Sequence, residues 1–206
     1  MDSAGPQPLP VNQPAFWEEV YQNGRAGWDL GGPTPTFRRL AESRAYPPGR
    51  MIVLGAGRGH DAREFARHGF TVTAVDFAAD PVREMRALAD SQAPVKILQA
   101  DIFNLPAELA GAFDYVLEYT CYCAIDPRRR PEYASLAASL LKRGGRFIAL
   151  AFPIDGRPGG PPFAVNVDEM LDLLTARGFT LLQREIPPDS IKPRRGAEAL
   201  LVLQKQ

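Results

Sequence analysis

The sequence predicts an α/β protein in which a doubly wound, mostly parallel seven-stranded sheet ends in an antiparallel hairpin. Short apolar runs alternate with segments of helical periodicity between residues 51 and 178, and this alternation places helices on both faces of a parallel sheet. The last two apolar runs, 179–186 and 198–205, have no helix between them and are therefore expected to pair antiparallel. At 206 residues, the chain is long enough to bury the core of one domain.

Each element follows from a local pattern. Strands are predicted where short apolar runs suit a sheet buried on both faces, at 51–55, 70–76, 95–101, 112–119, 146–152, 179–186 and 198–205. Thr34 and Pro35 are typical of a helix N-cap and a first helical position. Further helices are predicted at 15–21, 62–66, 81–89, 133–141 and 167–174. Gly69, Gly144 and Gly178 end three of them.

Composition and charge exclude several classes of protein. The 24 basic and 24 acidic residues give a formal net charge of zero, which argues against nucleic acid as a main partner. No apolar stretch approaches the roughly 18 residues of a membrane span, and the N-terminus lacks a signal-like apolar core. Cys121 and Cys123 are too few for a disulfide framework or a zinc site, so we expect no metal and a reducing, cytoplasmic location. Residues 1–14, rich in proline and polar residues, are predicted to form a flexible arm before a single domain over 15–206.

A glycine-rich loop, "GAGRGHD" at 55–61, follows the first of the alternating strands. A dinucleotide fingerprint reads G-x-G-x-x-G, but here the third glycine comes one residue early. Asp61 stands at the start of the next helix, where the helix dipole favours a carboxylate but the carboxylate repels a pyrophosphate. The Lys-Ser or Lys-Thr of a P-loop does not follow either. The loop therefore suits a small ligand that approaches the backbone closely and brings no phosphate.

Acidic residues end the next two strands of the pattern. Asp76 lies where an acid accepts hydrogen bonds from a ribose diol in sheets of this type. Asp101 is followed by apolar side chains, so its carboxylate can take an adenine amino group while its neighbours flank the ring. Asp61 or Glu118 can hold an ammonium group directly or through water. With a loop that receives no phosphate, these positions describe a site for S-adenosylmethionine.

Five longer segments carry a resemblance to a known family. "WEEVYQNGRAGWDLGGPTP" and "VLGAGRGHDAREFARHGFTVTAVDFA" are similar to the N-terminal cover and to the cofactor loop of class I S-adenosylmethionine-dependent methyltransferases of the thiopurine S-methyltransferase family. "YCAIDPRRRPEYA", "GGPPFAVNV" and "IKPRRG" resemble more narrowly the subgroup that contains plant halide and thiol methyltransferases. The resemblance runs from about Phe16 to the last predicted strand.

This resemblance implies a Rossmann-like methyltransferase fold, S-adenosyl-L-methionine as cofactor and S-adenosyl-L-homocysteine as product. Residues 15–45 would be a helical cover over cofactor and substrate, and Tyr119 would lie at the floor of the transfer site. The cofactor-binding residues expected from the residue patterns and the resemblance are Trp17, Trp28, Gly55, Gly57, Gly59, Asp61, Asp76, Phe77, Asp101, Ile102, Phe103 and Glu118.

The methyl acceptor is expected to be a small soft nucleophile, such as a thiol, sulfide, halide or thiopurine-like compound, that is methylated by in-line displacement. The sulfonium already carries a good leaving group. His60 lies inside the glycine loop and His68 near the far end of the helix, so neither is well placed as a general base. This scarcity favours an acceptor that is already anionic or easily ionised. The candidate acceptor-pocket residues are Tyr119, Cys121, Tyr122, Phe152, Phe163 and Arg195.

Three departures from the subgroup bear on the acceptor: Tyr21 replaces an expected tryptophan, Cys121 a common aromatic residue, and Phe152 an expected tyrosine. Other functions therefore stay open. An O- or N-methyltransferase of a small metabolite would keep the cofactor and use another base. A nicotinamide-dependent oxidoreductase is disfavoured by the glycine spacing, and a non-catalytic module would bind the cofactor without turnover. We expect a monomer or weak dimer that acts on a small molecule, with no nucleic acid or membrane partner.

Overall fold

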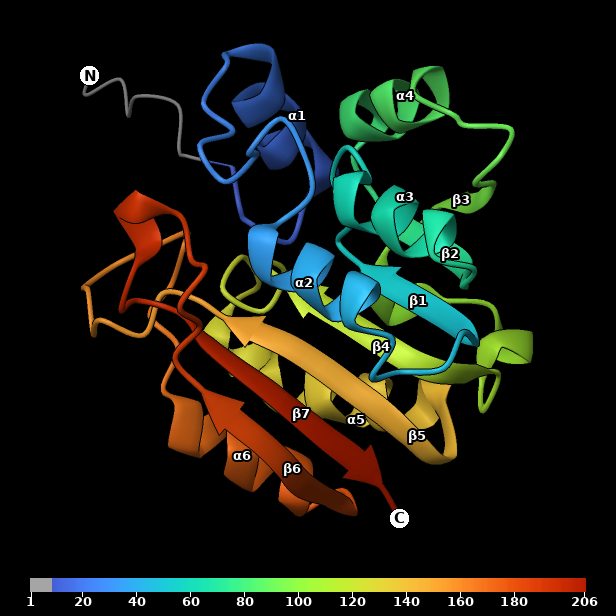
Figure 1. Cartoon of the computed structure of the whole chain (residues 1–206). Coiled ribbons are helices and arrows are strands. Elements are labelled where there is room, and N and C mark those ends of the chain that lie inside the picture. The colour runs from blue at the N-terminus through green and yellow to red at the C-terminus, as the bar shows by residue number, and fades with distance from the viewer. Residues whose placement is uncertain (1–8) are drawn as a thin grey trace, which may run out of the picture.

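The computed structural model describes residues 9–206, and residues 1–8 of the predicted arm lie outside the described residues. It contains a seven-stranded sheet with the order β3-β2-β1-β4-β5-β7-β6 (Figure 1). The strands β3, β2, β1, β4 and β5 run parallel to one another, and β7 is antiparallel to both β5 and β6. This topology confirms the predicted doubly wound sheet with its C-terminal hairpin. The strands are β1 (Arg50–Leu54), β2 (Thr71–Asp76), β3 (Val95–Gln99), β4 (Phe113–Tyr119), β5 (Leu141–Ala151), β6 (Phe179–Glu185) and β7 (Ala199–Lys205).

Helices cover both faces of the sheet (Figure 1). On one face lie α2 (Pro35–Ser43), α3 (His60–Arg67) and α4 (Ala79–Ala87), and on the other lie α5 (Arg130–Leu140) and α6 (Val167–Thr175). The first helix, α1 (Pro14–Gln22), packs against α4. Four short 3-10 helices lie in the connections: η1 (Ile102–Asn104), η2 (Ala107–Leu109), η3 (Pro127–Arg129) and η4 (Lys192–Arg194). No helix in residues 9–206 combines the length and the apolar character that crossing a bilayer requires.

The central strands are apolar throughout because both of their faces are buried. Met51 and Val53 of β1 belong to the core under α2 and α3, whereas Ile52 and Leu54 belong to the core under α5 and α6. Successive side chains of a strand point to opposite faces, so one short run contributes to both cores. This is why the runs read as continuous apolar stretches and not as alternating ones.

The end of α5 differs from the sequence prediction for a physical reason that the structure shows. The apolar spacing predicts a helix through Leu141, but α5 ends at Leu140 and β5 begins at the next residue. Leu141 is fully buried and pairs with Phe113 of β4. Its apolar side chain fits both the helical pattern and the strand, and the pairing with β4 decides between them. Gly144, the predicted helix stop, lies inside β5 with a φ of 77°.

Candidate active site

The main cavity, with a volume of about 540 Å³, lies at the carboxyl ends of the parallel strands. Its lining includes a residue at or within two positions of the end of each of five strands. These residues are Asp101 after β3, Asp76 of β2, Gly55 after β1, Thr120 after β4 and Phe152 after β5. Strand order reverses between β1 and β4, and doubly wound sheets bind their ligands at this switch point. A smaller cavity of about 60 Å³ adjoins it and shares four lining residues, Tyr21, Trp28, Gly55 and Thr120.

The glycine loop packs closely against its surroundings. Gly55 has a φ of 61°, and a Cβ on it would lie 2.8 Å from the Sγ of Cys121, so a larger residue does not fit. Gly57 donates its backbone N–H to Asp76 at 2.8 Å and lines the smaller cavity. Gly59 lies outside the lining of both cavities, and a Cβ there would come within 2.6 Å of the Met85 side chain on α4. The structure thus places the third glycine against α4 and outside the lining of both cavities.

Two carboxylates at the strand ends border the main cavity. The side chain of Asp76 accepts hydrogen bonds from the backbone N–H groups of Gly57 and Ala78, and burial raises its pKa. Asp101 accepts the backbone N–H of Phe103 at 2.9 Å and the side-chain amide of Asn104 at 3.0 Å. An ionised carboxylate has about four lone-pair positions, so each side chain keeps acceptor capacity for a ligand. Of the other expected cofactor contacts, the cavity lining includes Trp17, Trp28, Phe77, Ile102 and Phe103.

The two carboxylates expected to hold an ammonium group lie outside the lining of the main cavity. Asp61 accepts the backbone N–H and the hydroxyl of Thr34, at 2.7 and 2.9 Å, and burial raises its pKa to about 6. It lines only the smaller cavity. Glu118 accepts the backbone N–H groups of Cys121 and Tyr122 through Oε1, and burial raises its pKa to about 7. Glu118 belongs to the lining of neither cavity, and its two hydrogen bonds hold the turn after β4.

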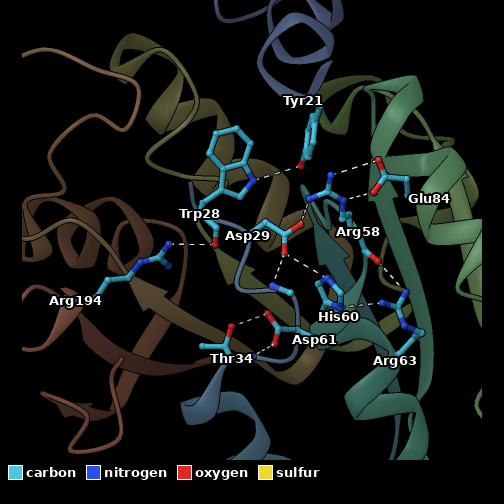
Figure 2. Close-up of polar contacts among 11 residues, drawn as sticks. Tyr21, Trp28, Asp29, Thr34, Arg58, His60, Asp61, Arg63, Glu84 and Arg194 are labelled. Atoms are coloured by element: carbon cyan, nitrogen blue, oxygen red, sulfur yellow. Dashed lines mark hydrogen bonds and ion pairs between the residues drawn. The ribbon is translucent and has the colours of Figure 1, made fainter. Parts of the chain in front are cut away.

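A polar network joins the N-terminal segment to the glycine loop (Figure 2). Asp29 pairs with Arg58, and its Oδ1 lies 3.3 Å from Nε2 of His60. The contact with His60 and, to a lesser degree, that with Arg58 hold the pKa of Asp29 well below its usual range. Arg58 also pairs with Glu84 of α4. The sequence does not indicate this role for Asp29 and Arg58, since nothing in their spacing signals a contact across the fold. The network fastens the segment that carries Trp28 beside the cavity.

A second anchor comes from the C-terminal half of the chain. Arg194 is buried, and its guanidinium donates a hydrogen bond to the carbonyl oxygen of Trp28 at 3.1 Å (Figure 2). It also donates to the carbonyl oxygen of Gly27 at 3.3 Å and to the hydroxyl of Tyr119. Tyr119 donates in turn to Glu198 at 2.6 Å. The Arg194 guanidinium carbon also lies 4.7 Å from the centre of the Phe152 ring. Arg194 and Phe152 therefore form part of the cavity wall beyond β4.

Several predicted acceptor-pocket residues lie elsewhere. Cys121 and Phe152 line the main cavity, while Tyr119 lines the smaller one. Three others line neither: Tyr122, Phe163 and Arg195. The ring of Tyr122 packs against Tyr133 in the core, with ring centroids 5.4 Å apart.

The physical reasons for the other two differences are equally local. Phe163 packs on the backbone of Gly160, where a Cβ would come within 2.4 Å of its ring. Arg195 is exposed, whereas the preceding Arg194 is turned inward by η4 and takes the place expected for its neighbour. Both cysteines are free and buried, and burial raises the pKa of each thiol, so neither is an activated nucleophile.

Thr120 has an unusual backbone conformation. Its φ is 59°, a left-handed value that disfavours L residues by about 1–2 kcal/mol and is least suited to a β-branched side chain. Within residues 9–206, Arg44 at the end of α2 is the other non-glycine residue with a positive φ. Thr120 is only partly buried, so core packing does not explain the conformation.

The doubly wound sheet, the phosphate-free glycine loop and the carboxylates at the ends of β2 and β3 define an S-adenosylmethionine-dependent methyltransferase. A sequence model described as thiopurine S-methyltransferase matches residues 12–204. The chain belongs to the thiopurine S-methyltransferase family, and it is accordingly an enzyme whose cofactor is S-adenosyl-L-methionine.

Similar proteins include plant and bacterial members of this group. A probable thiol methyltransferase 2 of Arabidopsis thaliana is 35% identical over 192 residues, which cover 92% of this chain and 84% of the relative. Thiocyanate methyltransferase 1 of Brassica oleracea is 35% identical, covering 89% and 82%. A thiopurine S-methyltransferase of Aliivibrio salmonicida is 33% identical, covering 87% and 90%.

A solved structure supports the fold. It is the 1,6-didemethyltoxoflavin-N1-methyltransferase of Burkholderia thailandensis, with 1,6-didemethyltoxoflavin and S-adenosylhomocysteine bound. It superposes with a TM-score of 0.75 at 23% identity, and the alignment covers 100% of this chain and 93% of that one. The predicted Rossmann-like methyltransferase fold is thereby confirmed.

Proposed function

We propose that this enzyme transfers the methyl group of S-adenosyl-L-methionine to a small soft nucleophile, namely a thiol, hydrosulfide, halide or thiopurine-like compound. The observation that carries the proposal is the wall beyond β4, which includes Phe152, Cys123, prolines and the buried guanidinium of Arg194, 4.7 Å from the centre of the Phe152 ring. Neither His60 nor His68 lines this cavity, so an acceptor that needs a strong general base is disfavoured. The names of the plant relatives, which refer to thiol and thiocyanate, agree with such an acceptor.

The residues present suit the cofactor. Asp76 and Asp101 offer free acceptor positions on adjacent strands, which matches a ribose diol and an adenine amino group. Residues 15–45 act as the cover, with Trp17 and Trp28 over the cofactor and Asp29 fastened to the glycine loop. When bound, the cofactor supplies a methyl group on a sulfonium that is already a good leaving group. The chain itself therefore has to align the acceptor and exclude water.

Alignment should contribute more than charge attraction. Correct positioning of two reactants can supply about 7–11 kcal/mol of a barrier. Two unit charges about 4 Å apart attract by only about 4 kcal/mol at an effective dielectric of 20. The Arg194 guanidinium is moreover within 4.0 Å of Glu198, which partly balances its charge. Arg194 thus orients an anionic acceptor against Phe152 more than it concentrates anions.

A panel of acceptors tests this proposal directly. Purified protein with methyl-labelled S-adenosylmethionine is given hydrosulfide, thiocyanate, iodide, a thiopurine, a phenol and an amine at equal concentrations. Label should pass to the sulfur and halide acceptors. Transfer to the phenol or the amine alone would establish the O- or N-methyltransferase instead, and cofactor binding without any transfer would indicate a non-catalytic module.

The cofactor site is tested by Asp76→Ala. Loss of one or two charge-assisted hydrogen bonds should weaken binding of S-adenosylhomocysteine by about 1.5–3 kcal/mol each. Calorimetric titration measures the affinity, and a melting curve checks the loop, since Asp76 also accepts from Gly57 and Ala78. Asp80→Ala is the matched control, because this acid of α4 lines neither cavity. Unchanged affinity in Asp76→Ala would remove this residue from the site.

Location and assembly belong to the same proposal. The enzyme acts in the cytoplasm as a monomer or weak dimer, with small molecules and not nucleic acid as partners. The zero net charge and the two free cysteines support this. Sedimentation at micromolar concentration would show a stable higher oligomer if the expected assembly is wrong.

A further inference from the structure

The order of the strands arranges the cavity as a row. Along the sheet the order β3-β2-β1-β4-β5 brings Asp101, Asp76, Gly55, Thr120 and Phe152 to successive places at the carboxyl edge. Neighbouring strands lie about 4.8 Å apart. In the proposed function, the nucleoside lies at the β3 and β2 end and the acceptor near β5. The sulfur that joins them then lies at β1 and β4, beside Gly55 and Thr120.

The hydroxyl of Thr120, after β4, can act toward a ligand only as a hydrogen-bond acceptor. Its Oγ1 donates its hydrogen to the carbonyl oxygen of Tyr119 at 2.7 Å. The hydroxyl proton is therefore occupied, and what remains for a ligand is an oxygen that only accepts. Thr120 lines both cavities, so this residue stands at their boundary.

The turn around Thr120 is held on several sides. Cys123 directs its thiol to the carbonyl oxygen of Thr120 at 3.4 Å, and Glu118 accepts the N–H groups of the next two residues. Glycine would adopt the same backbone conformation without the steric cost. The hydrogen bonds around the turn hold the backbone of Thr120 in a strained conformation, although its side chain does not pack in the core. Strain of this kind is typical of functional sites.

We infer that Thr120 Oγ1 is the acceptor that faces the electropositive methyl and methylene carbons of the cofactor sulfonium. Carbon atoms next to a sulfonium carry polarised C–H bonds, which are better donors to oxygen than ordinary ones. The thioether of the product carries no charge and polarises its neighbours much less. Thr120 would therefore favour the cofactor over its product, and its contribution rests on the proposed placement of the cofactor.

The test compares the affinities of Thr120 variants for S-adenosylmethionine and S-adenosylhomocysteine by calorimetry. Thr120→Ala should weaken binding of the cofactor about three- to tenfold and leave the product within about twofold. Thr120→Ser, which keeps the hydroxyl, should restore the wild-type ratio of the two affinities. An equal loss for both ligands, or no loss for either, would overturn the inference. If wild-type protein bound neither ligand, the proposed cofactor site itself would fail, which is a different result.

A glycine variant separates function from folding. Thr120→Gly should lose cofactor affinity as Thr120→Ala does, while its melting temperature rises by about 2–4 °C, because the strained conformation is relieved. Arg44→Gly is the matched control, since Arg44 has a φ of 53°, is exposed and lies outside both cavities. It should raise the melting temperature and change neither affinity. A lower melting temperature in Thr120→Gly would show that the threonine serves the fold.

Discussion

Replacing Arg194 by alanine is expected to lower kcat/KM about 100-fold and to destabilise the protein by about 3–5 kcal/mol. The guanidinium leaves three acceptors behind: the carbonyl oxygens of Gly27 and Trp28, and the hydroxyl of Tyr119. It also leaves Glu198, whose side chain is 2% exposed, as a buried charge without its cation. The segment that carries Trp28 would lose its anchor to the C-terminal half of the chain.

The adjacent arginine is the control for this experiment. Arg195→Ala removes the same charge from the same loop, but Arg195 is exposed and lines neither cavity. We expect kcat/KM within about twofold of wild type, as for an ordinary surface position. Steady-state kinetics and urea unfolding measure both effects. Equal losses of kcat/KM in Arg194→Ala and Arg195→Ala would mean that the activity depends on the positive charge of this loop and not on the buried contacts of Arg194.

A double variant separates stability from function. In Arg194→Met with Glu198→Gln, the buried charge is removed together with its partner, so much of the lost stability should return. The activity should not return, because no donor remains for the Trp28 carbonyl. If activity recovered with stability, Arg194 would act only by keeping the protein folded.

Glu118→Gln is expected to remove a pH dependence of stability. Burial raises the pKa of Glu118 from 4.5 to about 7, so the native protein holds this proton more tightly than the unfolded chain. Below pH 4.5 the Glu118 carboxyl is protonated in both the native and the unfolded protein, so it does not lower the free energy of unfolding. As pH rises from about 4.5 to about 7, the wild type loses stability, and above pH 7 the full penalty for the buried charge applies. Both hydrogen bonds go to Oε1, which glutamine retains.

The variant should therefore be more stable than wild type by up to about 3 kcal/mol at pH 8 and similar to it at pH 4.5. Urea unfolding at several pH values measures the difference. Asp61, whose pKa burial raises to about 6, adds a similar slope at lower pH in both proteins and cancels in the comparison. The same slope in the two proteins between pH 6 and 7 would contradict the prediction. Unchanged cofactor affinity would exclude Glu118 from the ammonium site.

Local patterns sufficed for most of the fold. The apolar run at 51–54 has no alternation, and only a strand buried on two faces satisfies it in a chain of this kind. Thr34 and Pro35 do begin a helix, at Pro35. However, Thr34 donates its hydroxyl to Asp61 on α3 and makes no side-chain hydrogen bond to its own helix. A capping residue is visible in sequence, but its partner 27 positions away is not.

The site shows the same division. Asp76 and Asp101 could be predicted because strand ends of a parallel sheet share one edge. The inward turn of Arg194 could not, since it and Arg195 are the same residue type one position apart. Nor could the pairing of Asp29 with Arg58, which depends on where the N-terminal segment crosses the glycine loop.

By itself the sequence determined the strands, their order of appearance, the phosphate-free loop and the carboxylates at the strand ends. These depend on hydrophobic periodicity and on residue types within a few positions of one another. The tertiary structure alone decided which arginine is buried, which carboxylates border the main cavity, and that Thr120 has a left-handed conformation and lines both cavities. Those outcomes depend on hydrogen-bond partners that come together only when distant segments pack.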